Sequence, residues 1–244
     1  MVITINGKAI APDEVLSWEE GRKSYVVKRL VRLFRIPKAE YTLDELAALK
    51  RGISDDEMRR KLKSKIAICT VGTVFLNALC CGKRKSSVAE IDLPGIDAKT
   101  VYDGYFDVMI NNTEENLLLG VRANPDHYLL RGMSDNRQEV IECTGAIPFP
   151  SRFIIHYGNE KGLHSKADAD YPYQAVGVCC LANGTPIGGV RHQMKDTNTG
   201  THIRLEVEFP EALPKKILAQ HQLHLACEFT NWFGAILRRN RYVG

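Results

Sequence analysis

The chain has 244 residues, of which 44% are hydrophobic and 25% charged; this is enough apolar content for a folded core and excludes an intrinsically disordered protein. Residues 1–87 contain 18 Lys and Arg against 10 Asp and Glu, whereas residues 88–244 contain 15 against 19. A balance of +8 in the first part and −4 in the second predicts a basic surface that binds a polyanion or an anionic membrane.

The first third is predicted to be mainly helical after a short strand at residues 3–9. Apolar residues repeat at helical spacing over residues 23–36, and Pro37 ends that segment. Two capping boxes follow at residues 42–45 and 54–57, because a hydroxyl side chain at each N-cap precedes a glutamate three residues later. Two further helices are therefore expected to begin there.

The second of these helices continues into a nearly uninterrupted apolar run at residues 66–81. The run has 16 residues, and a membrane span needs roughly 20. We therefore predict a buried central helix rather than a transmembrane one.

Strand patterns dominate from residue 88 onward. Alternating apolar residues predict strands at 102–110 and 201–209, and Asn183-Gly184 predicts a hairpin with a type I′ turn between residues 175 and 190. Pro214 is predicted to start a last, amphipathic helix that runs to about Arg239. Further short strands are expected at residues 116–121, 127–131, 139–144 and 153–157.

These elements predict an α+β fold with a basic helical N-terminal region, an antiparallel-leaning β middle and a C-terminal amphipathic helix. Residues 1–87 would form the basic helical region. Residues 88–244 would form the β-rich body with its terminal helix, the two regions packing as one compact unit. Alternating helix–strand units are absent, which argues against a doubly wound nucleotide-binding fold.

The basic residues of the first third are the candidate polyanion-binding site. Residues 59–65 contain five cations in seven positions, a pattern found in phosphate-backbone contacts and nuclear-import segments and also on ordinary solvated helix faces. No zinc-finger, RNA-recognition-motif or KH-type pattern accompanies them, so sequence-specific base recognition is not predicted. The candidate contacts are Arg29, Arg32, Arg35, Arg59, Arg60, Lys61, Lys63, Lys65, Lys83, Arg84 and Lys85.

Cysteine usage predicts an intracellular protein. The seven cysteines include the adjacent pairs Cys80-Cys81 and Cys179-Cys180, which do not suit a secreted disulfide framework, so reduced thiols are expected. The sequence shows no signal-peptide pattern, and we expect a cytoplasmic or nuclear location, or a virion if the source is viral. Because Cys80 and Cys81 lie beside a polybasic segment, lipidation there is an alternative to two small core residues at a helix end.

No metal site, cofactor or catalytic residue is predicted. His221, His224 and Cys227 recur every three residues on the last helix, but the third residue drifts away from the face that the first two share. A small cytosolic enzyme remains an alternative, because catalytic residues distant in sequence can meet in space. Its candidate residues are Cys143, His156, His164, Asp168 and Asp170.

The chain loosely resembles a rhabdovirus matrix protein, of the type found in plant-infecting nuclear members of that group. The resemblance is one of order and pattern over about 60 residues: the aromatic segment 105–110, the late strand 201–209 and the segment 232–237 of the terminal helix. It implies self-association, condensation of a nucleocapsid and membrane contact. It transfers no individual functional residue.

Together these observations predict a non-enzymatic, self-associating structural or assembly protein. Its basic N-terminal surface would bind RNA, nucleoprotein or an anionic membrane, with an affinity that falls steeply with salt as counterions are released. A homo-oligomer is expected. The alternatives are the enzyme with a dispersed site and a nuclear-targeted effector or host-interaction protein that uses its basic clusters only for import.

Overall fold

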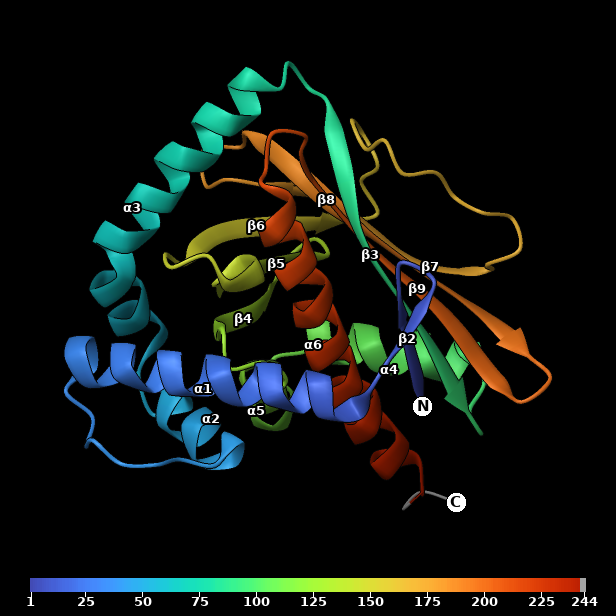
Figure 1. Cartoon of the computed structure of the whole chain (residues 1–244), viewed down its shortest axis with the longest axis horizontal. Coiled ribbons are helices and arrows are strands. Elements are labelled where there is room, and N and C mark those ends of the chain that lie inside the picture. The colour runs from blue at the N-terminus through green and yellow to red at the C-terminus, as the bar shows by residue number, and fades with distance from the viewer. Residues whose placement is uncertain (242–244) are drawn as a thin grey trace.

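A single antiparallel sheet of nine strands forms the framework of the computed structural model, which describes residues 1–241 (Figure 1). Its first turn is Asn6-Gly7, where both residues have positive φ, as a tight hairpin turn between two short strands requires. The strands are β1 (Val2–Ile5), β2 (Lys8–Ile10), β3 (Arg84–Pro94), β4 (His127–Met133), β5 (Arg137–Glu142), β6 (Ser151–Tyr157), β7 (Tyr173–Cys180), β8 (Pro186–Thr197) and β9 (Gly200–Pro210).

The spatial order of the strands is β2-β1-β3-β9-β8-β7-β6-β5-β4. Strands β4 to β9 form a meander in which each strand pairs with the next, and β9 then pairs along its whole length with β3. The hairpin β1–β2 extends the sheet beyond β3. The N-terminal residues and the C-terminal half of the chain therefore share one sheet.

In the described part of the chain six α-helices accompany the sheet, and α6 lies across one of its faces (Figure 1). Three helices separate β2 from β3, two separate β3 from β4, and the last follows β9. A one-turn 3₁₀ helix at Thr144–Ala146 follows β5. The α-helices are α1 (Pro12–Phe34), α2 (Leu43–Arg51), α3 (Asp55–Leu79), α4 (Ala98–Ile110), α5 (Glu114–Arg122) and α6 (Lys215–Arg241).

The main core lies between the sheet and the helices α4 and α6. Ile91 and Ile203 from adjacent strands pack in the same apolar cluster as Tyr105 of α4 and Phe229 and Phe233 of α6, and all five are buried. A second, smaller cluster joins α1, α2 and the first turns of α3 to the ends of β4 and β5. The helices of the first third are thus anchored to the sheet edge formed by β4 and β5.

The predicted fold class is wrong. The chain does not begin with a helical region that precedes a β-rich body, because β1 and β2 belong to the same nine-stranded sheet as β9. The strands predicted at 102–110 and 116–121 are instead parts of two helices, α4 and α5, which span residues 98–110 and 114–122. Val101, Tyr105 and Val108 are buried at helical spacing, and Asp97 caps the helix by accepting from the Thr100 backbone N–H.

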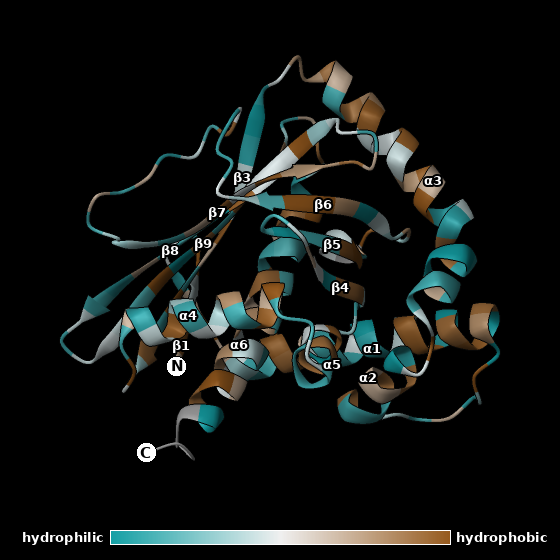
Figure 2. Cartoon of the chain, turned by 180° about the vertical axis from the view of Figure 1, so that it is seen from behind, coloured by the Kyte–Doolittle hydropathy of each residue, from teal (hydrophilic) through white to brown (hydrophobic). Residues whose placement is uncertain are grey.

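The predicted burial of residues 66–81 is also wrong. Within residues 1–241, one helix, α3, is long and apolar enough by length and composition to cross a membrane, and only 6% of its most apolar window is buried. Figure 2 shows the apolar second half of α3 beside the sheet rather than inside the core. Its most exposed apolar side chains are Ile68, Val71, Phe75 and Leu79.

The predicted helix caps are confirmed, and the hairpin is confirmed in place but not in turn type. Thr42 and Glu45 form the full capping box of α2, and Ser54 caps α3 by accepting from the Glu57 backbone N–H. The hairpin of β7 and β8 turns near Asn183-Gly184, but only Gly184 has a positive φ, so the turn is not type I′. Strand β9 and helix α6 lie where alternation and the proline start predict them.

Candidate functional site

A cavity of about 130 Å³ lies between the inner face of the sheet and α6, with one side of α3 contributing to its wall. Most of its wall is apolar, which suits an organic ligand better than a highly charged one. Apolar lining residues include Leu76 of α3, Leu130, Val140, Ile155, Val190 and Val207 of the sheet, and Leu225 and Phe229 of α6.

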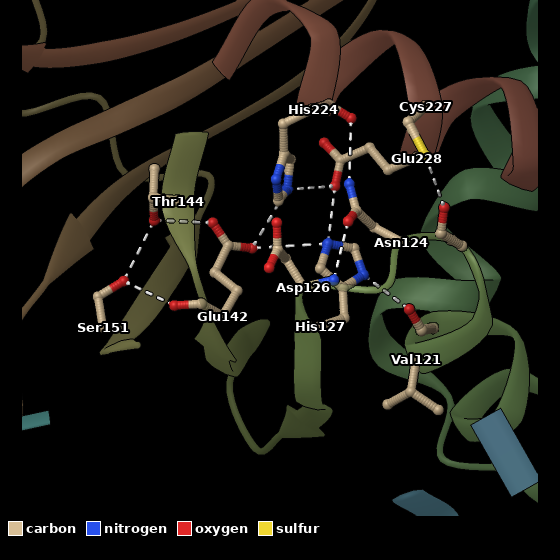
Figure 3. A network of polar contacts seen from close by, with 12 residues as sticks. Val121, Asn124, Asp126, His127, Glu142, Thr144, Ser151, His224, Cys227 and Glu228 are labelled. Atoms are coloured by element: carbon tan, nitrogen blue, oxygen red, sulfur yellow. Dashed lines mark hydrogen bonds and ion pairs between the residues drawn. The ribbon is translucent and has the colours of Figure 1, made fainter. Parts of the chain in front are cut away.

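One part of this wall is strongly polar. His127 at the start of β4, Glu142 at the end of β5, and His224 and Glu228 one turn apart on α6 all line the cavity and are all buried (Figure 3). One nitrogen or carboxylate oxygen from each residue lies within 4.8 Å of those of the other three. We call these four residues the His–Glu cluster.

Neighbouring groups fix the orientation of the His–Glu cluster. The His127 Nδ1 atom lies 2.8 Å from the Gly120 carbonyl oxygen, which can only accept, so Nδ1 carries a proton. Thr144 Oγ1 donates to Glu142 Oε1 over 3.0 Å (Figure 3). His127 is therefore held by a backbone carbonyl of α5, and Glu142 by the 3₁₀ helix that follows β5.

The two carboxylates raise the proton affinity of one histidine. Burial by itself would lower the pKa of His224, but Glu228 and Glu142 outweigh it and raise that pKa to about 9. Burial likewise opposes ionisation of Glu228, but His224 and His127 hold its pKa well below the usual range. The cluster therefore stabilises a positive charge between its carboxylates.

Two further histidines of the cavity wall have lowered pKa values, in contrast to His224. Burial lowers the pKa of His192 to about 4, and burial together with His224 lowers that of His221 to about 3. Both side chains are therefore neutral near pH 7. They supply polar edges to the cavity without adding charge.

The structure buries one of the predicted polyanion contacts. Arg29 is 8% exposed, and its guanidinium donates to Tyr128, Tyr25, Cys143 Sγ and the Pro148 carbonyl oxygen. Its partners Tyr128 and Cys143 belong to the second apolar cluster, so Arg29 stabilises the fold and offers little surface to a polyanion. Arg32 and Arg35, at the end of the same helix, are exposed.

The cluster at residues 59–65 is partly used within the protein. Arg59 donates to Glu139 over 2.6 Å and to Asp56 over 2.8 Å, and the Lys65 ammonium lies 5.6 Å from the ring centre of Phe149. Arg60 and Lys63 are exposed, and Lys61 is half-buried. From the sequence we expect that replacing Arg59, Arg60 and Lys61 with Glu would leave the fold intact; the structure argues against this for Arg59, because charge reversal there would break its ion pair with the buried Glu139.

The last basic group, residues 83–85, is also only partly exposed, because some of its side chains form hydrogen bonds within the protein. Lys83 is exposed, but Arg84 donates to Asn77 Oδ1 over 2.7 Å, and Lys85 donates to the Leu213 carbonyl oxygen. Of the two candidate lipidation sites, Cys80 is buried and its sulfur accepts from the Ala212 backbone N–H, whereas Cys81 is exposed. Polyanion binding by the remaining exposed cations stays a prediction.

The residues suggested for a dispersed enzyme site lie in different surroundings. Cys143 is buried against Arg29, and burial raises the pKa of its thiol to about 12, so it is a poor nucleophile near pH 7. His156 lies on β6, while His164, Asp168 and Asp170 follow it in the loop before β7. Among the described residues, no hydrogen bond joins Cys143 to any of these four.

Sequence reasoning missed three of the four residues of the His–Glu cluster. His224 was considered as a metal ligand only with His221 and Cys227, which the structure places outside the cluster. The i, i+4 spacing of His224 and Glu228 is a recognisable helical pair. His127 and Glu142 offered no such spacing, because they reach the site through the sheet.

Comparisons with known proteins do not identify a family or a function for this chain. No family model matches the chain, and no curated protein matches it. Among solved structures, Ara h 8.0201 is similar with 11% identity and a TM-score of 0.43, over 64% of this chain and 99% of that one. An uncharacterized protein from Rhizobium leguminosarum is similar with 11% identity and a TM-score of 0.33, over 62% and 95%. Likenesses this weak identify neither family nor function.

Proposed function

We propose that this protein binds a small, mostly apolar molecule in the cavity between the sheet and α6. The observation that supports this is an apolar cavity that ends in a buried charged cluster, the usual arrangement of a ligand site. Its volume of about 130 Å³ is similar to that of an engineered protein cavity of about 150 Å³ that accepts benzene. A ligand with about one ring fits this space.

The polar wall would orient such a ligand. Apart from the His–Glu cluster, the cavity is lined by Tyr105, Gln138 and Tyr157, whose polar atoms are linked: the two hydroxyls lie 3.3 Å apart, and the Tyr157 hydroxyl donates to Gln138 over 3.1 Å. A ligand with one hydroxyl or amine group can hydrogen-bond to one of these groups while its ring contacts the apolar wall. We therefore expect phenol to bind more tightly than toluene.

The experiment measures binding of phenol and toluene by NMR chemical-shift changes and by thermal unfolding. The wild-type protein should bind phenol and unfold at a higher temperature with it. Val207→Phe adds a ring at the cavity wall and should weaken binding at least tenfold, whereas Val2→Phe adds the same ring at an exposed position and should not. Equal binding by both variants, or none by the folded wild-type protein, would refute the proposal.

A second candidate function, contact with an anionic membrane, is supported by the outward face of α3. Ile68, Val71, Phe75 and Leu79 form one exposed apolar stripe, with exposed fractions of 53%, 70%, 66% and 62%. Exposed lysines, Lys63 and Lys83, flank the stripe at its two ends. An apolar helix face bordered by lysines matches the surface of an anionic bilayer.

The length of the apolar part of α3 favours lying on the membrane over crossing it. Residues 66–79 would extend about 21 Å as a helix, which is less than the roughly 30 Å hydrocarbon core. Basic and acidic residues occupy the preceding half of the helix. We therefore propose that α3 lies in the interface.

Vesicle co-sedimentation tests this second candidate. Vesicles that contain phosphatidylserine should bind the protein more than phosphatidylcholine vesicles do, and binding should fall between about 50 and about 500 mM salt. Val71→Ser with Phe75→Ser should reduce binding at least tenfold, whereas Val2→Ser should leave it unchanged. Salt-sensitive binding to a generic RNA with no binding to vesicles would instead favour the predicted nucleic-acid partner.

A further inference from the structure

The ligand atoms of the His–Glu cluster have the spacing of a metal coordination shell (Figure 3). His127 Nε2 lies 2.9 Å from Glu228 Oε2 and 3.6 Å from Glu142 Oε2, and His224 Nε2 lies 3.4 Å and 3.8 Å from the same two oxygens. Two ligand atoms of a tetrahedral zinc ion lie about 3.3 Å apart, given zinc–ligand distances near 2.0–2.2 Å. All four His–Glu separations lie around that value.

The protonation of His127 leaves a buried lone pair that points into the cluster. Its Nδ1–H donates to the Gly120 carbonyl oxygen, and its Nε2 is buried with no hydrogen-bond partner among the described residues, although Glu228 Oε2 is close. In the neutral side chain this Nε2 lone pair faces two carboxylates, an arrangement that a metal cation between them stabilises, as a second proton on the ring also would. An Nδ1–H bonded to a backbone carbonyl is also the usual state of a metal-binding histidine.

The charge and chemistry of the donors select the kind of cation. Two carboxylates balance a divalent ion, and two imidazoles favour a transition metal over Mg²⁺ or Ca²⁺, which prefer oxygen ligands only. Both histidines are almost fully buried, and Glu142 and Glu228 are 8% and 7% exposed. The hydrogen bond from Thr144 to Glu142 holds one carboxylate in place, as outer partners of metal ligands do.

We infer that His127, Glu142, His224 and Glu228 bind one divalent transition-metal ion, with zinc as the ion that best suits this donor set. This site brings the ends of β4 and β5 together with α6, so the ion would link the sheet to the C-terminal helix. The inference does not depend on an organic ligand, since the four residues are sufficient as donors.

Calorimetric titration of the chelator-treated, dialysed protein with zinc sulfate tests the site. The wild-type protein should bind one equivalent. His224→Gln and Glu142→Gln should each weaken binding about 100-fold or more, because each removes one ligand with little change of shape. His192→Gln removes a buried histidine of the same cavity that lies outside the cluster, and it should keep wild-type binding.

X-ray absorption of the zinc-loaded wild-type protein is a second measurement that needs no variant. The expected shell contains nitrogen and oxygen only, because Cys143, Cys179 and Cys227 are not in the cluster. A shell that contains sulfur would overturn the inference. So would failure of the folded wild-type protein to bind zinc, or binding that both cluster variants retain.

Discussion

Lys50 links the helical part of the molecule to the segment that leads into the His–Glu cluster. It is buried, and its ammonium donates to the carbonyl oxygens of Val121, Pro125 and His127 over 2.6–3.1 Å. Val121 lies in the last turn of α5, Pro125 in the connection, and His127 at the start of β4, so the three contacts hold the segment that positions His127. One side chain of α2 thereby donates to three buried carbonyl oxygens around the connection between α5 and β4.

Lys50→Met should lower the free energy of unfolding by about 3 kcal/mol, because buried acceptors without a donor cost about 1–3 kcal/mol each and other groups compensate in part. Urea denaturation followed by circular dichroism measures this. Lys161→Met removes an exposed lysine and should change stability by less than about 0.5 kcal/mol. Equal stability of the two variants would show that the Lys50 contacts contribute little.

His192 should make stability depend on pH. It packs against Tyr105 and Phe229, and the charged group that affects it is Glu228; burial still lowers its pKa to about 4, below the unfolded value near 6.5. The folded protein therefore binds this proton more weakly than the unfolded chain does. The stability contributed by neutral His192 is fully present above pH 6.5 and is lost as the pH falls toward 4.

The size of that effect can be measured with His192→Gln, which cannot titrate. The difference in unfolding free energy between the wild-type protein and the variant should change by about 3 kcal/mol between pH 7 and pH 4, always in the direction that destabilises the wild type. A constant difference across that range would mean that His192 is not buried as a neutral group.

At the scale of elements, α3 is attached to the sheet near its N-terminal end. Arg59 contacts Glu139 of β5, which also accepts from Arg152 of β6 over 2.6 Å. Glu139 is buried, and although burial opposes its ionisation, the two arginines hold its pKa below the usual range. Met58 and Leu62 add the apolar part of this attachment.

Arg59→Met should destabilise the protein by about 2 kcal/mol, because it leaves Glu139 buried with one cationic partner instead of two. Arg60→Met, on the neighbouring exposed position, should cost less than about 0.5 kcal/mol. Thermal unfolding of both variants at low and high salt makes the comparison. Similar losses in the two would indicate that the Glu139 ion pair is as weak as a surface one.

Secondary-structure elements could be predicted from the sequence where interactions between residues close in sequence determine them. The caps of α2 and α3 depend on residues three apart, and they were predicted. Helix α4 was not predicted, because Tyr102, Phe106, Val108 and Ile110 suggest the alternation of a strand. Its buried residues have a helical period instead, and Asp97 caps its start. The exposure of α3 could not be predicted either, since a run of apolar residues does not reveal whether another part of the protein covers it.

At the scale of the whole molecule, the uneven charge predicts self-association. We expect the basic first third of one copy to attract the acidic remainder of another, although internal pairs such as Arg22 with Asp126 already neutralise part of this charge. Sedimentation velocity should show larger species at about 50 mM salt than at about 500 mM salt. A monomer at both salt concentrations would contradict the prediction of a homo-oligomer.

The candidate site is a property of the whole molecule as well. His127 and His224 are far apart in sequence and meet only because the meander brings β4 to the sheet edge and α6 returns across its face. The proximity of these two residues depends on the topology of the fold. That topology could not be predicted correctly while the residues of α4 and α5 were predicted as strands. Only the His224–Glu228 spacing on one helix was visible without the fold.

Helix α3 has two apolar sides with different neighbours. Cys69, Thr73 and Leu76 line the cavity, while Val71 and Phe75 face outward. A bilayer that shifts this helix would alter the cavity wall, and an occupant of the cavity would alter the stripe offered to the bilayer. The two binding equilibria would then be coupled. If lipid changes the affinity for the cavity ligand by some factor, the cavity ligand must change the affinity for lipid by the same factor.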